Sequence, residues 1–190
     1  MVMKFFMSQS RSLLLPTHRF TEVVEEVEKL GFDPTTMNYL LAVNSLGMTS
    51  KSLWERKSGV FRSFGMSEDQ ILSALKTKPS YILSSENKIR KVMGFFVNEL
   101  KISPLVISKA PGLILLSLEK TIVPRCSVLQ LLMSKGVLDG DFNLVPALRI
   151  THKKFEEKYV SKYQNVIPEV VEAHRGKIQF RGFPFELKLD

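Results

Sequence analysis

The fold is decided by the junction Phe64-Gly65-Met66-Ser67 and by related junctions along the chain. Two earlier copies are Leu30-Gly31-Phe32-Asp33 and Leu46-Gly47-Met48-Thr49, and Leu100-Lys101-Ile102-Ser103 has lysine in place of glycine. Glycine readily takes the left-handed conformation that ends a helix, and the next apolar residue folds back onto the last turn. The Asp, Thr or Ser that follows can cap the next helix by accepting a backbone N–H bond. The junctions therefore predict helices joined by tight turns.

Residues that follow the caps support the same prediction. Asp33-Pro34 and Ser103-Pro104 place proline at an expected first helical position, where no N–H partner is needed. Ser67 and Gln70 have the spacing of a capping box. Long alternating strand patterns are absent from the sequence, so the fold class is predicted to be all-α.

A second type of junction also repeats. Residues 78–86 read KPSYILSSE, residues 110–119 read APGLILLSLE, and Pro79 and Pro111 stand 32 positions apart. Each proline is expected to stop a short helix, and a small apolar turn and a serine then lead into a long helix. A unit of one short and one long helix is therefore predicted to recur.

The long helices share one apolar register with helical spacing. Its three copies are Leu53, Lys57, Val60 and Phe64, then Ile89, Met93, Phe96 and Leu100, then Ile122, Cys126, Leu129 and Met133. Cys126 takes the place of Met93 and is predicted to be a small buried hydrophobe. A period in the low thirties with helical faces predicts a right- or left-handed α-solenoid with repeats of about 32 residues.

Three segments follow from this pattern. Residues 1–20 contain no Asp or Glu and are expected to be a transit-like or disordered N-terminal segment. Residues 21–175 form the helical-repeat domain, and the amphipathic helix at 21–30 is expected to cover its front edge. Residues 176–190 show no helical period and are expected to form an irregular tail.

The charge balance favours a polyanionic partner. The 190 residues contain 27 Lys and Arg against 19 Asp and Glu, a formal net charge of +8. Residues 51–100 alone hold nine basic and five acidic side chains, so the positive excess lies mainly in the repeats. A basic surface of this kind suits nucleic acid. Improved solubility is the alternative explanation of the net charge.

Basic side chains on the long helices are the candidate nucleic-acid ligands. They are Arg56, Lys57, Lys88, Arg90, Lys91, Lys120 and Arg125. An ordinary solvated helix face is the alternative for each lysine. Arg125 borders the apolar register, so its guanidinium is expected either to fork onto a phosphate in the groove or to act as a structural clamp on carbonyls of a neighbouring helix end or on a nearby carboxylate. The groove is slightly favoured.

Other chemistry is not indicated by the sequence. The single cysteine, Cys126, excludes an intrachain disulfide, and the three histidines are widely spaced, so neither a metal site nor a cofactor is expected. No phosphate-binding loop, dinucleotide fingerprint or nucleophile elbow is present, so catalysis is not expected. No apolar run is long enough to span a membrane. Most aromatic residues fit core positions, and only Trp54 and Tyr81 are candidates for base stacking.

These motifs together resemble those of plant members of the mitochondrial transcription termination factor (mTERF) family. The similar stretch runs from about Gly31 to Pro168. The segments that carry the resemblance are residues 61–68, 78–84, 111–118, 124–129 and 154–160. About three or four repeat units fit in this stretch, which predicts a short member of the family with few repeats.

The resemblance implies both a fold and a function. It implies an arched superhelix that binds double-stranded DNA or RNA on a basic concave surface in a mitochondrion or chloroplast. The expected role is non-catalytic regulation of transcription, including termination, or RNA processing, by a protein expected to be a monomer. The alternatives are a helical scaffold for a protein partner, because α-solenoids offer concave surfaces to either ligand, and a truncated relative without function.

Overall fold

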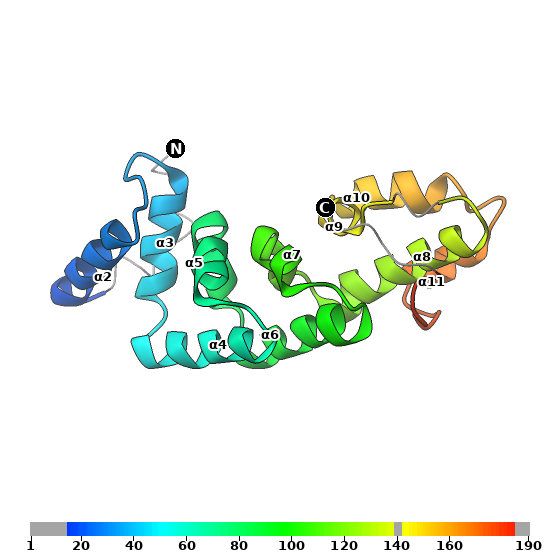
Figure 1. Ribbon diagram of the computed structural model, residues 1–190. Coiled ribbons are helices and arrows are strands. Elements are labelled where there is room, and N and C mark those ends of the chain that lie inside the picture. The colour runs from blue at the N-terminus through cyan, green and yellow to red at the C-terminus, as the bar shows by residue number, and fades with distance from the viewer. Residues whose placement is uncertain (1–14, 139–141, 185–190) are drawn as a thin grey trace. The chain divides into compact units, whose positions relative to one another are not determined.

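A computed structural model describes residues 15–138 and 142–184 of the chain, and all regular structure in these residues is helical (Figure 1). The prediction of an all-α repeat fold is thus confirmed. The α-helices are α2 Thr17–Lys29, α3 Met37–Gly47, α4 Lys51–Ser63, α5 Glu68–Thr77, α6 Glu86–Met93, α7 Pro104–Lys109, α8 Val123–Ser134, α9 Leu144–Arg149, α10 His152–Phe155 and α11 Glu169–His174.

Tighter and wider helical turns complete the long helices and their connections. The 3₁₀ segments are η2 Pro79–Leu83 and η4 Pro111–Leu115. The π segments are η3 Gly94–Glu99, η5 Leu118–Ile122 and η6 Glu156–Ser161. Because η3 follows α6 directly, η5 runs into α8 and α10 runs into η6, three long helices span residues 86–99, 118–134 and 152–161.

The chain forms two compact units. The first consists of Met1–Arg90 with Ile107–Pro111, and the second of Lys91–Val106 with Gly112–Asp190. In the first unit, Val23 and Val27 of α2 are fully buried where this helix packs on α3. In the second unit, α8 packs on α11 and buries residues such as Leu129 and Val170 completely. Each unit therefore has its own apolar core.

The left-handed turns occur at three of the four predicted junctions. Gly31 and Gly65 have φ values of 77° and 89°, and Lys101 takes the same conformation with φ of 57°. The prediction is wrong for Gly47, which is the last residue of α3 and is not left-handed. A Cβ atom at Gly47 would lie 2.7 Å from Cδ1 of Leu15, so glycine there permits close packing.

The helix caps differ from the prediction at two junctions. Thr36 caps α3, whereas Asp33 accepts hydrogen bonds from Thr35 in the turn before it, and Pro34 lies in that turn and not in the helix. Ser50 caps α4, and the neighbouring Thr49 is buried. In both cases the helix begins later than the junction pattern predicted.

Other predicted caps are confirmed. Ser67 and Gln70 form the capping box at the start of α5. Ser103 accepts a hydrogen bond from the N–H of Leu105, and Pro104 is the first residue of α7. Pro79 and Pro111 begin the 3₁₀ segments that follow the short helices.

The starts of the long helices show the repeat most clearly. Ser50, Ser85, Ser117 and Thr151 each accept a hydrogen bond from the backbone N–H three residues later. Between Ser117 and the core residue Ile122 there is one residue more than between Ser85 and Ile89. The π turn at η5 accommodates this residue, because the N–H of Ile122 bonds to the carbonyl of Ser117, five positions back.

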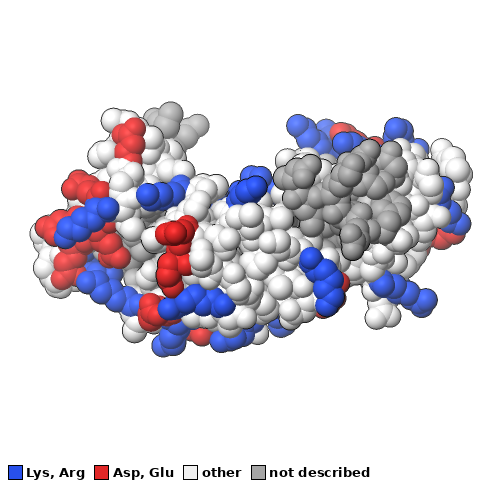
Figure 2. Space-filling view, viewed as in Figure 1, with Lys and Arg blue, Asp and Glu red and all other residues white. Residues whose placement is uncertain are grey.

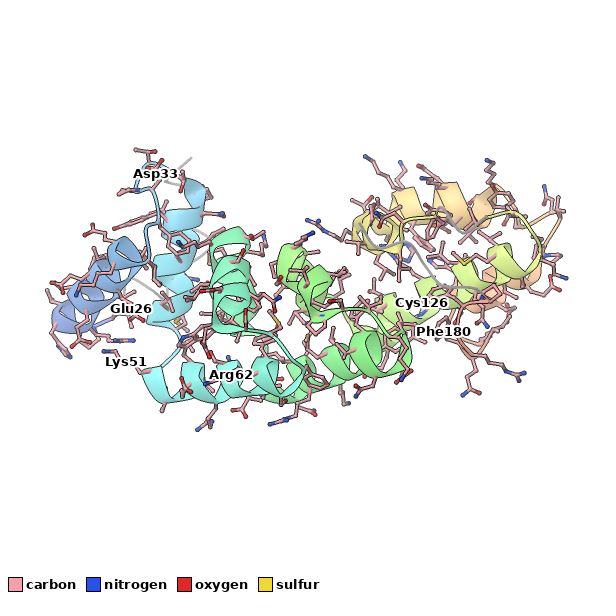
Figure 3. All side chains as sticks on the ribbon, viewed as in Figure 1. Glu26, Asp33, Lys51, Arg62, Cys126 and Phe180 are labelled. Atoms are coloured by element: carbon pink, nitrogen blue, oxygen red, sulfur yellow. The ribbon has the colours of Figure 1, made fainter. Side chains whose placement is uncertain are left out.

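The apolar register predicted for the long helices is confirmed. Ile89, Met93, Phe96, Ile122, Cys126 and Leu129 are buried to within 1% of complete burial. Cys126 lies on α8 (Figure 3), and burial raises the pKa of its thiol. Leu53, Phe64 and Leu100, at the ends of the register copies, are only half-buried.

The predicted N-terminal boundary of the repeat domain differs from the structure, whereas the described part of the predicted tail is irregular as expected. Helix α2 begins at Thr17, before the predicted boundary at residue 21, and residues 1–14 of the predicted N-terminal segment lie outside the described residues. Residues 177–184 form neither helix nor strand and lie against α8. Ser127 donates a hydrogen bond to the carbonyl of Ile178 at 3.2 Å, and the N–H of Arg181 donates to Gln130 at 3.1 Å.

Candidate nucleic-acid interface

Two of the candidate cations form ion pairs between successive long helices. In the first unit, Nε of Arg56 on α4 lies 2.9 Å from a carboxylate oxygen of Glu86, the first residue of α6. In the second unit, Nζ of Lys91 lies 3.7 Å from a carboxylate oxygen of Glu119 in η5. Both pairs join a long helix to the first turn of the next, and we call them the inter-repeat ion pairs. Because their side chains are solvent-exposed or half-exposed, each pair contributes about 0–1 kcal/mol to stability.

Two further candidates are exposed and form no ion pair within the described part of the chain. Arg90 lies on α6 in the first unit, and Lys120 lies in η5 in the second. No carboxylate in residues 15–138 or 142–184 comes within the 4.0 Å ion-pair distance of either charge. Lys88, also on α6, is half-exposed. Arg90 and Lys120 can therefore approach a phosphate without breaking an ion pair to the described residues.

Lys57 does not reach the surface. Its side chain belongs to a residue only 4% exposed, and Nζ donates a hydrogen bond of 2.5 Å to the carbonyl oxygen of Ile82 in η2. Burial lowers the pKa of Lys57, and the nearby carboxylate of Glu86 partly offsets this. The predicted phosphate contact therefore does not agree with this geometry, because the ammonium group is already bound inside the first unit.

Arg125 is also buried, with 4% of the residue exposed. Its Nη1 donates to the carbonyl oxygens of Leu148 at 2.8 Å and Ile150 at 2.7 Å, and more weakly to Ala147 at 3.4 Å. Its guanidinium carbon lies 4.7 Å from the centre of the Phe155 ring. Burial lowers the pKa of the guanidinium. This is the structural alternative of the sequence analysis, and the slightly favoured groove interpretation is not supported.

The two buried cations perform the same task in different repeats. Lys57 binds a carbonyl three residues before Ser85, and Arg125 binds a carbonyl three residues before Thr151. Each of these carbonyls lies in the short helical segment before the next long helix, η2 for Ile82 and α9 for Leu148. The buried cation of one long helix therefore binds carbonyl groups near the helix end of the following repeat, which carry partial negative charge.

The two base-stacking candidates differ in how deeply they are buried. Tyr81 is 1% exposed, its hydroxyl donates to the carbonyl of Ile71 at 3.1 Å, and its ring packs 5.2 Å from that of Phe61. Burial raises the pKa of this hydroxyl. Tyr81 is therefore a core residue and cannot stack on a base in this conformation. Trp54 on α4 is half-buried.

Several basic residues outside the candidate set are exposed. On α4, Arg62 pairs with Glu55 and, at 3.3 Å, with Glu68, so its charge is compensated locally (Figure 3). The exposed lysines of α10 and η6 were not among the residues predicted from the sequence to bind nucleic acid. Their sequence spacing could have indicated them, because Lys154 and Lys158 stand four residues apart and therefore lie on the same face of a helix.

Other kinds of site receive no support in the described residues. Residues 15–138 and 142–184 contain no group of three His, Cys, Asp or Glu side chains placed to hold a metal ion. In the same residues no helix combines the length and the apolar character that a membrane crossing requires. The rings of His152 and His174 lie 4.8 Å apart, and burial, followed by the charge of His152, lowers the pKa of His174.

The repeated pairing of short and long helices, with exposed cations on the long ones, defines a basic α-helical repeat protein. The mTERF family model matches residues 2–156, and the chain belongs to this family. Its members are generally organellar, non-catalytic proteins that bind nucleic acid and regulate transcription. The comparisons found no matching relative among curated proteins and no matching solved structure.

Proposed function

We propose that this chain binds double-stranded DNA or RNA in a plant mitochondrion or chloroplast and regulates transcription, including its termination, or RNA processing. It acts as a monomer, without catalysis and without a cofactor. Membership of the mTERF family supports this role, and the net charge of +8 supplies the attraction for a polyanion.

The observation that carries the proposal is that Arg90 and Lys120 are exposed on long helices and form no ion pair with any carboxylate of residues 15–138 or 142–184. Arg90 can bind a phosphate with its planar fork, and Lys120 can do so as a point charge. Arg56 and Lys91 can exchange their carboxylate partners for phosphates, because exposed ion pairs are weak. Lys88 completes the proposed set. Lys57 and Arg125 are left out because they are buried.

Fluorescence titration of labelled duplex DNA and duplex RNA at several salt concentrations tests this function. The double variant Arg90→Gln with Lys120→Gln loses two phosphate contacts. It should therefore bind duplexes more weakly, and its slope of log affinity against log salt should be smaller by about 2. The matched control is Lys29→Gln with Lys76→Gln, which removes the same charge from exposed positions elsewhere in the chain. A wild-type protein that binds neither duplex would instead favour the protein-scaffold alternative.

A further inference from the structure

The last long helix of the second unit has a regular basic edge. Thr151 caps this helix, α10 continues directly into η6, and the buried side is formed by Phe155, Tyr159 and Val160. Lys154, Lys158 and Lys162 lie four residues apart on the same helix or at its end, and all three are exposed. We call these three residues the lysine row.

The geometry of the helix keeps the lysine row nearly straight. Residues four apart on an α-helix rise by about 6 Å and rotate by about 40° relative to each other. The π turn over Glu156–Ser161 is wider than an α turn, so it reduces this rotation. The rise of about 6 Å corresponds to roughly two nucleotide steps of one strand, at about 3.4 Å each.

Each of the two acids on this helix lies within 4.0 Å of a residue outside the lysine row. Glu156 lies 3.9 Å from His152, and Glu157 lies 4.0 Å from Lys153. Within the described part of the chain, no carboxylate comes within ion-pair distance of the lysine row. This arrangement differs from Arg56 and Lys91, whose charges are compensated by the inter-repeat ion pairs.

Neighbouring tyrosines hold two of these lysines. The Nζ atom of Lys158 lies 5.1 Å from the centre of the Tyr159 ring, and Nζ of Lys162 lies at the same distance from the Tyr163 ring. Contact with an aromatic ring restricts a lysine side chain and lowers the entropy lost when it binds a ligand. In Figure 2, blue side chains stand along the edge over α10.

We propose that Lys154, Lys158 and Lys162 bind every second phosphate along one strand of a nucleic-acid backbone. This inference rests on the proposed function and adds a binding site to it in the second unit. Lysine ammonium groups act as point charges and carry no planar hydrogen-bond pattern, so the lysine row contacts the backbone without reading bases.

The test compares the full-length chain with Lys154→Gln, Lys158→Gln and Lys162→Gln combined. The probes are two labelled DNA duplexes of unrelated sequence and the corresponding RNA duplexes, each titrated at several salt concentrations. Each lost phosphate contact should lower the slope of log affinity against log salt by about 0.9, so three lost contacts should lower it by roughly 2.7. The affinity itself should fall at least about tenfold near physiological salt. The affinity should fall by the same factor for both duplex sequences, because the lysine row does not read bases.

The control variant combines Lys29→Gln, Lys76→Gln and Lys135→Gln, which removes the same charge from exposed positions outside the lysine row. Thermal unfolding measured by circular dichroism verifies that both variants are folded. If the wild type binds duplexes and the two variants behave alike, the lysine row is refuted and the proposed function stands. If the wild type binds none of the duplexes, both proposals are refuted.

Discussion

Arg125 lies where two repeats meet and binds backbone groups in place of solvent. Its guanidinium bridges the carbonyls of Leu148 and Ile150, at the end of α9 and just before the cap of the next helix. A hydrogen bond to a charged group contributes about 1.5–3 kcal/mol to stability, and a buried polar group left unpaired costs about 1–3 kcal/mol. The side chain therefore stabilises the core of the second unit.

The first prediction is that Arg125→Met lowers the free energy of unfolding by about 3 kcal/mol, because the carbonyls lose their shared donor. For a chain of this length, that loss lowers the midpoint of thermal unfolding by roughly 6–12 °C. Circular dichroism melting curves measure the effect. Arg125→Lys should recover part of it, since one ammonium group can bind one or two of the carbonyls.

Arg149→Met is the matched control, because Arg149 is exposed and such changes usually stay within about 0.5 kcal/mol. An Arg125→Met protein that melts like the wild type but binds duplexes weakly would assign Arg125 to the nucleic-acid surface after all.

At the scale of the elements, three turns between helices use the same left-handed backbone conformation with different residues. Gly31 and Gly65 take the left-handed conformation readily, whereas Lys101 takes it with φ of 57°. For a residue with a side chain this conformation costs about 1–2 kcal/mol. The turn between the long helix at residues 86–99 and α7 is therefore a strained one.

The second prediction is that Lys101→Gly stabilises the protein. The gain from relieving the left-handed lysine exceeds the extra entropy of glycine in the unfolded chain by roughly 0.5–1 kcal/mol. Chemical denaturation should show the increase as a higher midpoint with an unchanged slope. Lys101→Ala removes the same charge but keeps a Cβ atom, so it should give no such increase. Equal stabilisation by both variants would mean that charge, and not backbone conformation, is responsible.

At the scale of the molecule, the sequence contained most of the fold because each repeat carries local signals. Capping residues, prolines and an apolar register belong to single helices, and the structure agrees with most of them. The function of Gly47 could not be predicted, because it depends on the close approach of Leu15, a residue distant in sequence. The cap at Ser50 was missed because threonine, at the neighbouring Thr49, is also a residue type that caps helices.

The candidate site was harder to predict than the fold. Lys57 occupies the same register position as Met93 and Cys126, and this position correctly indicated burial, whereas its charge indicated a phosphate ligand. Charge alone does not show whether a cation binds solvent, a carboxylate or a backbone carbonyl. That choice depends on the next repeat, which supplies the carbonyl of Ile82 to Lys57 and the carboxylate of Glu86 to Arg56.

The inter-repeat ion pairs give the last prediction, which concerns both units. Glu86 and Glu119 each compensate a cation that the proposed function assigns to nucleic acid. Glu86→Gln with Glu119→Gln should therefore raise duplex affinity several-fold and steepen the salt slope by up to about 2, because Arg56 and Lys91 no longer exchange partners on binding. The change in stability should be small, since exposed pairs contribute about 0–1 kcal/mol each. Glu25→Gln with Glu169→Gln changes the net charge equally at exposed positions away from the two pairs, so it separates a local effect from a general one. Equal gains in both variants would show that net charge alone controls affinity and that the ion pairs do not compete with phosphate.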